Sequence, residues 1–96
     1  MAIGISLVNF TDQGIKSIKD SPKRAAAFSE LARKQGVKVR DVYWTTGQYD
    51  MVVIAEGTDD ALTALLLSVG RLGNVRSQTL HAMDQESFQR VLAKVD

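Results

Sequence analysis

The sequence contains no cysteine, a single proline, a single histidine and no long hydrophobic run. Without cysteine the chain has neither a disulfide framework nor a thiolate, which excludes thiol chemistry and cysteine-ligated metal centres. The one histidine, His81, would need further ligands from acidic residues or from another subunit, and no ligand spacing accompanies it. We therefore expect no metal site and no cofactor.

The net charge is also small, because 12 basic and 11 acidic residues leave a formal charge of only +1. A nearly neutral chain offers no electrostatic reason to bind nucleic acid. The apolar stretch at residues 61–70 falls well short of the roughly 18 residues that a membrane span requires. Residues 1–10 lack the basic leader and the cleavage site of a signal peptide. We expect a cytoplasmic protein with no nucleic-acid partner and no membrane partner.

What is present is a regular succession of strand-like and helix-like segments, sufficient for one domain over residues 1–96. Apolar patterning and turn signals predict four strands, over residues 3–10, 37–46, 50–56 and 75–83. Helical spacing predicts one helix over 22–35, a second from Thr58 to Gly73, and a terminal helix capped by Asp84. The order β-α-β-β-α-β-α is typical of the α+β split βαβ, or ferredoxin-like, fold with an added C-terminal helix.

The predicted helix ends carry specific signals. Thr11 or Asp12 is placed to cap a short helix after the first strand. Ser21 followed by Pro22 predicts an N-cap and a first helical residue, so the Ser21 hydroxyl should accept the free amide hydrogens of the helix. Gly36 is placed as the left-handed terminator of the same helix.

Half of the aromatic residues, Tyr43, Trp44 and Tyr49, surround Gly47 between two β-rich runs, which predicts an antiparallel hairpin. A turn at residues 47–48 fixes which residues lie opposite each other across the hairpin. The expected pairs are Thr46 with Tyr49, Trp44 with Met51, and Val42 with Val53.

This register divides the hairpin into two faces. The first face, suited to a core under the helices, comprises Arg40, Val42, Trp44, Thr46, Tyr49, Met51, Val53 and Ala55. The second comprises Val39, Asp41, Tyr43, Thr45, Asp50, Val52, Ile54 and Glu56. Since the second face is too apolar for water and too acidic for a plain core, we expect it to face another copy of the chain.

A homodimer or a higher homo-oligomer follows from that expectation. Hiding about 600 Å² of apolar area per subunit would supply roughly 15 kcal/mol of gross burial. Association costs of about 4–15 kcal/mol offset much of this gain. The terminal helix, which carries Phe88, Val91, Leu92 and Val95 on one side, is expected to pack over the domain's own core, with contact to another subunit as the alternative.

The second hairpin face holds four of the six candidate ligand-binding residues. Asp50 at a strand entry would handle a proton or a cationic ligand; alternatively, it accepts hydrogen bonds from turn amides or from Thr45. Arg76 would hold an anion or form a salt bridge across the sheet. The predicted ligand-binding set is Asp41, Tyr43, Thr45, Tyr49, Asp50 and Arg76, and no catalytic residue is assigned.

Two further positions have competing interpretations. Arg24, near the start of the first long helix, would pair with Asp20 or bind an anion. Trp44 would pack in the core or stack on a flat ligand. His81 is expected to be an ordinary hydrogen-bonded strand residue.

Gly47-x-Tyr49-Asp50 resembles the signature of the GYD-domain family, small bacterial proteins of unsettled function. Two further regions carry the resemblance, which extends over nearly the whole chain: residues 11–15 with 18–24, and residues 72–76 with 79–80. The resemblance implies a dimeric α+β barrel, built by subunits that pair their sheet faces. The chain departs from the family pattern at His81, where the resemblance implies arginine.

Three functions stay open at this point. The first is a noncatalytic oligomeric module that binds a small ligand or another protein between paired sheets. The second is a cofactor-free enzyme of the small monooxygenase type, in which Tyr43, Asp50 and His81 would transfer protons. The third is a purely structural assembly unit whose interior is filled by side chains.

Overall fold

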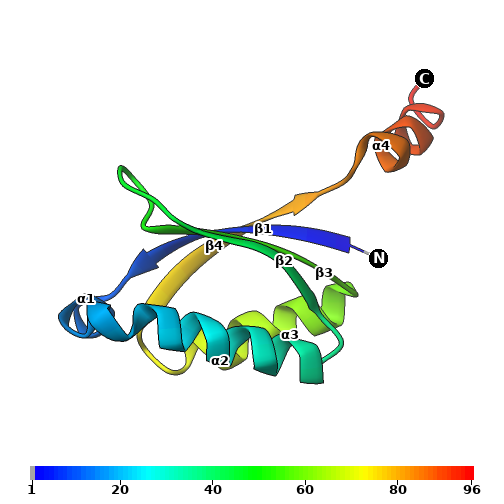
Figure 1. The fold of residues 1–96 in the computed structure, drawn as a ribbon. Coiled ribbons are helices and arrows are strands. Elements are labelled where there is room, and N and C mark those ends of the chain that lie inside the picture. Colours follow the sequence, from blue (N-terminus) through cyan, green and yellow to red (C-terminus); the bar gives the residue numbers. More distant parts are fainter. Residues whose placement is uncertain (1) are drawn as a thin grey trace.

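The structure, a computed structural model, describes residues 2–96 as a four-stranded antiparallel sheet with two long helices on one face (Figure 1). The strands are β1 (Ala2–Phe10), β2 (Lys38–Trp44), β3 (Met51–Gly57) and β4 (Val75–Ala82). The helices are α1 (Asp12–Lys16), α2 (Ser21–Lys34), α3 (Asp59–Gly70) and α4 (Gln85–Leu92), with a 3-10 turn, η1, at Ile18–Asp20. The strand order β2-β3-β1-β4 is that of the ferredoxin-like fold, so the predicted fold is confirmed.

Most predicted helix ends are confirmed. Thr11 caps α1 by accepting the amide hydrogen of Gly14, and Thr58 caps α3 by accepting that of Ala61. Gly36 has φ +79° just beyond α2, a backbone conformation that glycine adopts without strain.

The predicted cap at Ser21 is wrong. Ser21 is the first residue of α2, and its buried hydroxyl accepts a hydrogen bond from Trp44 Nε1 at 2.9 Å. That bond joins the start of α2 to the end of β2. It also places the Trp44 ring at the edge of the helix-covered face, where the residue is 47% exposed instead of enclosed in the core.

The core lies between the sheet and the two long helices, in two clusters. One contains Ala32, Val37, Ala55 and Leu65, and the other contains Val8, Met51 and Val53. Within residues 2–96 these seven are the only buried hydrophobic residues, and Leu65 is the only large side chain that is fully enclosed. A core this small leaves a thin margin of stability for a chain of this length.

The hairpin of β2 and β3 has the predicted central register, since Val42 pairs with Val53 and Trp44 with Met51. Two predictions for the end of the hairpin away from the turn are wrong. A β-bulge between Val39 and Asp41 turns Val39 into the core, where it packs against both clusters. The same bulge releases Arg40 from the core face, and its guanidinium lies 3.3 Å from Glu56 Oε1.

At the turn end of the hairpin, the paired residues end at Trp44 and Met51, and Thr45 makes the next contacts. The Thr45 amide donates to Asp50 O at 2.8 Å, and its hydroxyl donates to Tyr49 O at 2.6 Å. Gly47 has φ +112° in this turn. The bond from Thr45 to Asp50 continues the predicted register, and the expected pair of Thr46 with Tyr49, which lies beyond the paired residues, stays a prediction.

The segments that follow β1 and precede β4, at this same end of the sheet, are locked together. Thr11 donates its amide hydrogen to Asn74 O at 3.1 Å and its hydroxyl hydrogen to Gly73 O at 2.6 Å. The Gln13 amide group donates to Leu72 O at 3.0 Å and to Asn74 Oδ1 at 2.9 Å. These bonds fix the start of α1 against the loop between α3 and β4.

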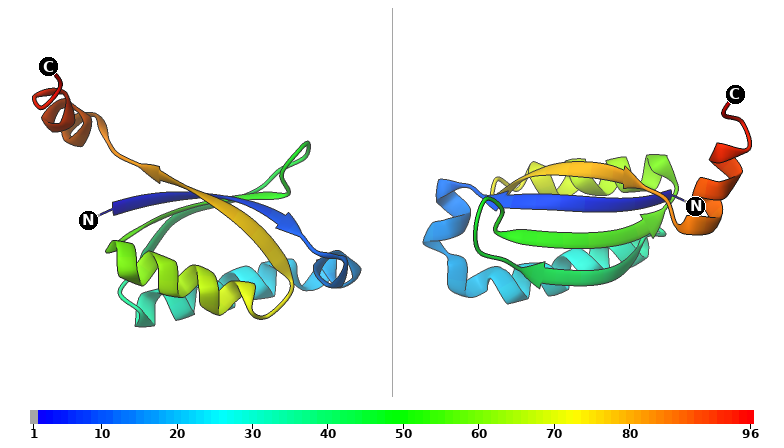
Figure 2. Two further views of the ribbon diagram at one scale, coloured as in Figure 1. Left: turned by 180° about the vertical axis from the view of Figure 1, so that it is seen from behind. Right: turned by 90° about the horizontal axis from the view of Figure 1, so that it is seen from above.

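The terminal helix α4 does not pack over the domain's own core, so that prediction is wrong. It leaves the end of β4 and projects away from α2 and α3, on the other side of the sheet (Figures 1 and 2). The described residues extend 50 Å along their longest axis and only 19 Å along their shortest. None of the described helices is long and apolar enough to cross a membrane.

Candidate functional site

The face of the sheet that α2 and α3 leave uncovered, hereafter the open face, is arranged in rows across the strands. One row is Tyr43, Val52, Leu7 and Gln78, and the next is Asp41, Ile54, Ile5 and Leu80. Aliphatic side chains therefore occupy the middle of the open face, and polar side chains occupy much of its edges. An apolar centre with a polar rim is the arrangement found in interfaces between proteins.

Several of the predicted ligand-binding residues lie on this open face. The Tyr43 hydroxyl is 3.4 Å from Asp41 Oδ1 at the β2 edge, and Tyr43 is 55% exposed. The Tyr49 hydroxyl lies 3.4 Å from Gln78 Oε1, so Tyr49 reaches the open face and not the core face where the sequence pattern placed it. Arg76 belongs to the row of Asn9, at the same end of the sheet.

Asp50 and Thr45 are engaged in holding the hairpin. Asp50 Oδ2 accepts the amide hydrogen of Phe10 at 2.9 Å, and the Asp50 amide donates to Val8 O at 2.8 Å. Pairing between β1 and β3 ends at Val8 and Met51, so the carboxylate satisfies an amide of β1 beyond the last strand pair. Asp50 thus has a structural contact, but its donor is the Phe10 amide of β1 and not a turn amide or Thr45, the donors expected from the sequence.

The three residues considered for proton transfer are not brought together. Tyr43 lies on the open face, whereas His81 pairs with Gly4 on the helix-covered face, where a Cβ at Gly4 would meet Leu62 of α3. Asp50 is bound to the Phe10 amide. Within residues 2–96, no group of three potential metal ligands lies close together.

The helix-covered face contains a groove. It has a volume of about 640 Å³ and lies between α2 and α3, which diverge along the sheet (Figure 2). We call it the α2–α3 groove. Its apolar walls include Phe10, Phe28, Leu31, Val42, Leu66 and Val69. The size falls within the roughly 300–1,000 Å³ typical of small-molecule sites.

A few polar groups lie in this groove. The hydroxyls of Ser6 and Thr79 are 2.8 Å apart on neighbouring strands, and Ser77 lies two residues before Thr79. Arg24 borders the groove, but its guanidinium donates to Ser17 O at 2.9 Å, to Ser17 Oγ at 3.1 Å and to Gly14 O at 3.2 Å. The predicted pairing of Arg24 with Asp20 is wrong, because the guanidinium instead ties α2 to α1 and the turn after it.

The groove was not predicted from the sequence, although a signal existed. Ser6, Ser77 and Thr79 are hydroxyl residues at positions whose alternation places them under the helices. A sealed core would favour aliphatic residues there. Leu72, inside the helix predicted from Thr58 to Gly73, instead lies beyond α3 and lines the groove while largely exposed.

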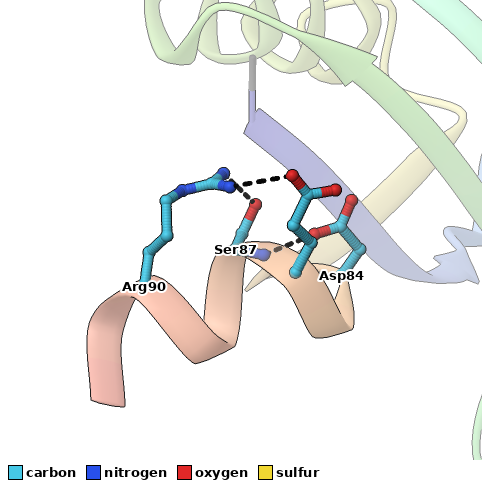
Figure 3. A network of polar contacts seen from close by, with 4 residues as sticks. Asp84, Ser87 and Arg90 are labelled. Atoms are coloured by element: carbon cyan, nitrogen blue, oxygen red, sulfur yellow. Dashed lines mark hydrogen bonds and ion pairs between the residues drawn. The ribbon is translucent and has the colours of Figure 1, made fainter. Parts of the chain in front are cut away.

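Among the charged groups, Asp84 has a pKa below its ordinary value. The main cause is the hydrogen bond that its carboxylate accepts from the Ser87 amide at 2.8 Å, with smaller contributions from the Ser87 hydroxyl and the charges of Arg90 and Arg40 (Figure 3). Figure 3 also shows Arg90 reaching back to the Ser87 hydroxyl at 3.0 Å. These contacts fix the start of α4.

Comparison with known protein families shows which family has this fold and sequence. The sequence profile of the GYD domain matches residues 5–92, nearly the whole chain. The chain belongs to the GYD-domain family. Its signature, Gly47 to Asp50, has a structural function here, since Gly47 forms the turn and Asp50 binds the Phe10 amide. No curated protein matches the sequence of this GYD domain.

Solved structures share the fold of this GYD domain at low sequence identity. A feast or famine regulatory protein from M. tuberculosis, complexed with L-methionine, is 19% identical with a TM-score of 0.66. MtbAldR is 15% identical with a TM-score of 0.58. The match covers 88% of this chain in both cases but only 52% of each relative, so the GYD domain spans about half their length. TTHA0845 from Thermus thermophilus is 24% identical, with a TM-score of 0.56, and the match covers 88% of this chain and 95% of that one.

Proposed function

We propose that this GYD domain is a noncatalytic homo-oligomeric module that binds a small, largely apolar ligand. The main support for ligand binding is the α2–α3 groove, whose apolar walls contain a few hydroxyl groups. Ligand sites typically combine such walls with a small number of polar groups that fix orientation. The open face supports the oligomer, because its aliphatic centre is uncovered within the described residues.

The residues predicted from sequence define a second place for a ligand, between paired open faces. Asp41, Tyr43, Tyr49 and Arg76 would contribute their polar groups there, while Thr45 and Asp50 would support the turn that carries Tyr49. The feast or famine relative was solved with L-methionine, which makes an amino acid with an apolar side chain a rational first probe.

One pair of neighbouring residues distinguishes the two places. Ser77 pairs with Val8 on the helix-covered face, and Gln78 pairs with Leu7 on the open face. Ser77→Phe would fill the groove, whereas Gln78→Phe adds the same ring on the opposite side of the same strand. Both residues are exposed, so either variant should fold.

The experiment is a thermal-shift screen of the wild type with a panel of apolar amino acids and carboxylic acids that includes L-methionine. A positive compound is then titrated against the two variants by calorimetry. Affinity lost only in Ser77→Phe would support binding in the α2–α3 groove. Affinity lost only in Gln78→Phe would indicate that the ligand binds between paired open faces instead. A panel without any stabilising compound would contradict the ligand-binding proposal.

A further inference from the structure

The terminal helix α4 carries an apolar stripe that nothing in its own chain covers. Phe88 is 49% exposed, Val91 is 44% exposed and Leu92 is 49% exposed, and Val95, just beyond the end of the helix, is 66% exposed. Phe88, Val91 and Leu92 repeat at the spacing of one helix face. Yet α4 makes no extensive contact with any other helix or strand in residues 2–96.

A helix of this length is not expected to persist alone in water. It has eight residues, whereas isolated helices shorter than about 12–15 residues are marginal even in favourable sequences. The cap at Asp84 and the ion pair between Arg90 and Glu86 support its first turns but leave the apolar stripe in solvent. Packing of the apolar stripe against another surface would bury these side chains and so stabilise the helix.

The position of α4 indicates which surface this is. Figures 1 and 2 show the helix rising beyond the end of β4, on the side of the open face and away from the α2–α3 groove. Leu80 lies on the open face of β4, and Met83 connects the strand to α4, both substantially exposed. Exposed apolar residues are therefore present on the sheet, in the connection and on the helix.

The area of the open face also calls for an extension. Four strands about 4.8 Å apart and some eight residues long cover a footprint of about 500 Å². A standard interface between proteins buries about 800 Å² on each partner. The exposed apolar residues of α4 would add to the footprint of the open face and bring the total closer to about 800 Å². Charges of both signs on α4, from Glu86 and Arg90, give it no preference for a polyanion or an acidic membrane.

We infer that α4 is an arm that packs on a second copy of the chain, the copy that covers the open face, with each copy lending its helix to the other. Reciprocal exchange of one element is the expected result of two-fold symmetry. This inference rests on the homo-oligomer of the proposed function. It goes further by making residues 84–95 part of the interface.

The test compares two charge-matched variants at the end of α4. Leu92→Glu places a carboxylate in the apolar stripe, and Ala93→Glu adds the same charge at an exposed position on the side away from the stripe. Dissociation constants measured by analytical ultracentrifugation should rise at least about tenfold for Leu92→Glu and stay near the wild-type value for Ala93→Glu. Equal constants for all three proteins would overturn the arm while leaving the oligomer intact.

Hydrogen exchange followed by mass spectrometry supplies a second readout on the full chain. Amides of residues 87–95 should be protected at high protein concentration and lose protection on dilution, because the helix is stable only against its partner. Protection that does not change with concentration would overturn the inference. A wild type that is monomeric at every concentration would refute the homo-oligomer of the proposed function. That outcome is distinct from an oligomer that forms without α4.

Discussion

Replacing Gly14 with alanine should destabilise the domain, although the same change in a helix normally stabilises it. Gly14 is buried in α1, and an added Cβ would overlap the Asn74 carbonyl oxygen and lie 2.9 Å from the carbonyl carbon. Both atoms belong to the backbone, so no side-chain rotation relieves the overlap. Either α1 or the loop before β4 must move.

The loss of stability can be worked out from the hydrogen bonds that join residues 11–13 to the loop before β4. Movement of the loop strains the bonds from Thr11 to Asn74 O and Gly73 O, and the bonds from the Gln13 amide group to the same loop. Losing two or three of them at about 0.5–1.5 kcal/mol each predicts a loss of about 1–4.5 kcal/mol. The ordinary gain from glycine to alanine in a helix is only about 0.5–1 kcal/mol.

Gly70 provides the matched control. It is also helical, at the end of α3, but a Cβ there would meet no atom within 4 Å. Urea unfolding monitored by far-ultraviolet circular dichroism should show a lower midpoint for Gly14→Ala and an unchanged or higher midpoint for Gly70→Ala. If Gly14→Ala is as stable as Gly70→Ala, the lock between α1 and the β4 loop is refuted.

Two further predictions concern carboxylates. Asp50→Ala should cost about 1–3 kcal/mol, because it leaves the Phe10 amide without its acceptor, and Asp50→Asn should cost less since its side-chain oxygen can still accept; equal losses in thermal unfolding would argue against this assignment. The folded pKa of Asp84 is depressed, so its stabilisation of α4 is present above the ordinary carboxyl pKa and lost as the pH falls through the folded value. Amide protection of α4 at high protein concentration should therefore fall below about pH 4, and Asp84→Asn should remove Asp84's contribution to this dependence; an unchanged pH profile in that variant would contradict the role of the cap.

The fold could be predicted from the sequence because its determinants are local. Strand alternation, the caps at Thr11, Thr58 and Asp84, and the turn at Gly47 each act within a few residues. Their order along the chain then selects the ferredoxin-like topology. The central hairpin register followed from the same turn.

The errors arose where distant residues decide the outcome. Ser21 was assigned as a cap because no local signal shows that Trp44 will compete for its hydroxyl. The bulge at Val39 shifts one strand by a residue, and strict alternation cannot reveal such a shift. The position of α4 was missed because its stripe shows only that it must pack, and not on which molecule.

The candidate site was predictable in part. Asp41 and Tyr43 lie together on the open face, as their two-residue spacing implied. The α2–α3 groove depends on how far two helices diverge, which is set by packing across the whole domain. The placement of the predicted ligand-binding residues around a bound molecule stays a prediction.

The central claim is that the aliphatic centre of the open face is covered by another copy of the chain. Sedimentation equilibrium of the wild type, over a concentration series from micromolar upward, tests this claim directly. The predicted result is a mass of at least twice the 10.5 kDa of one chain, falling only on dilution. A mass of a single chain at every concentration, with the open face fully in solvent, would contradict the account.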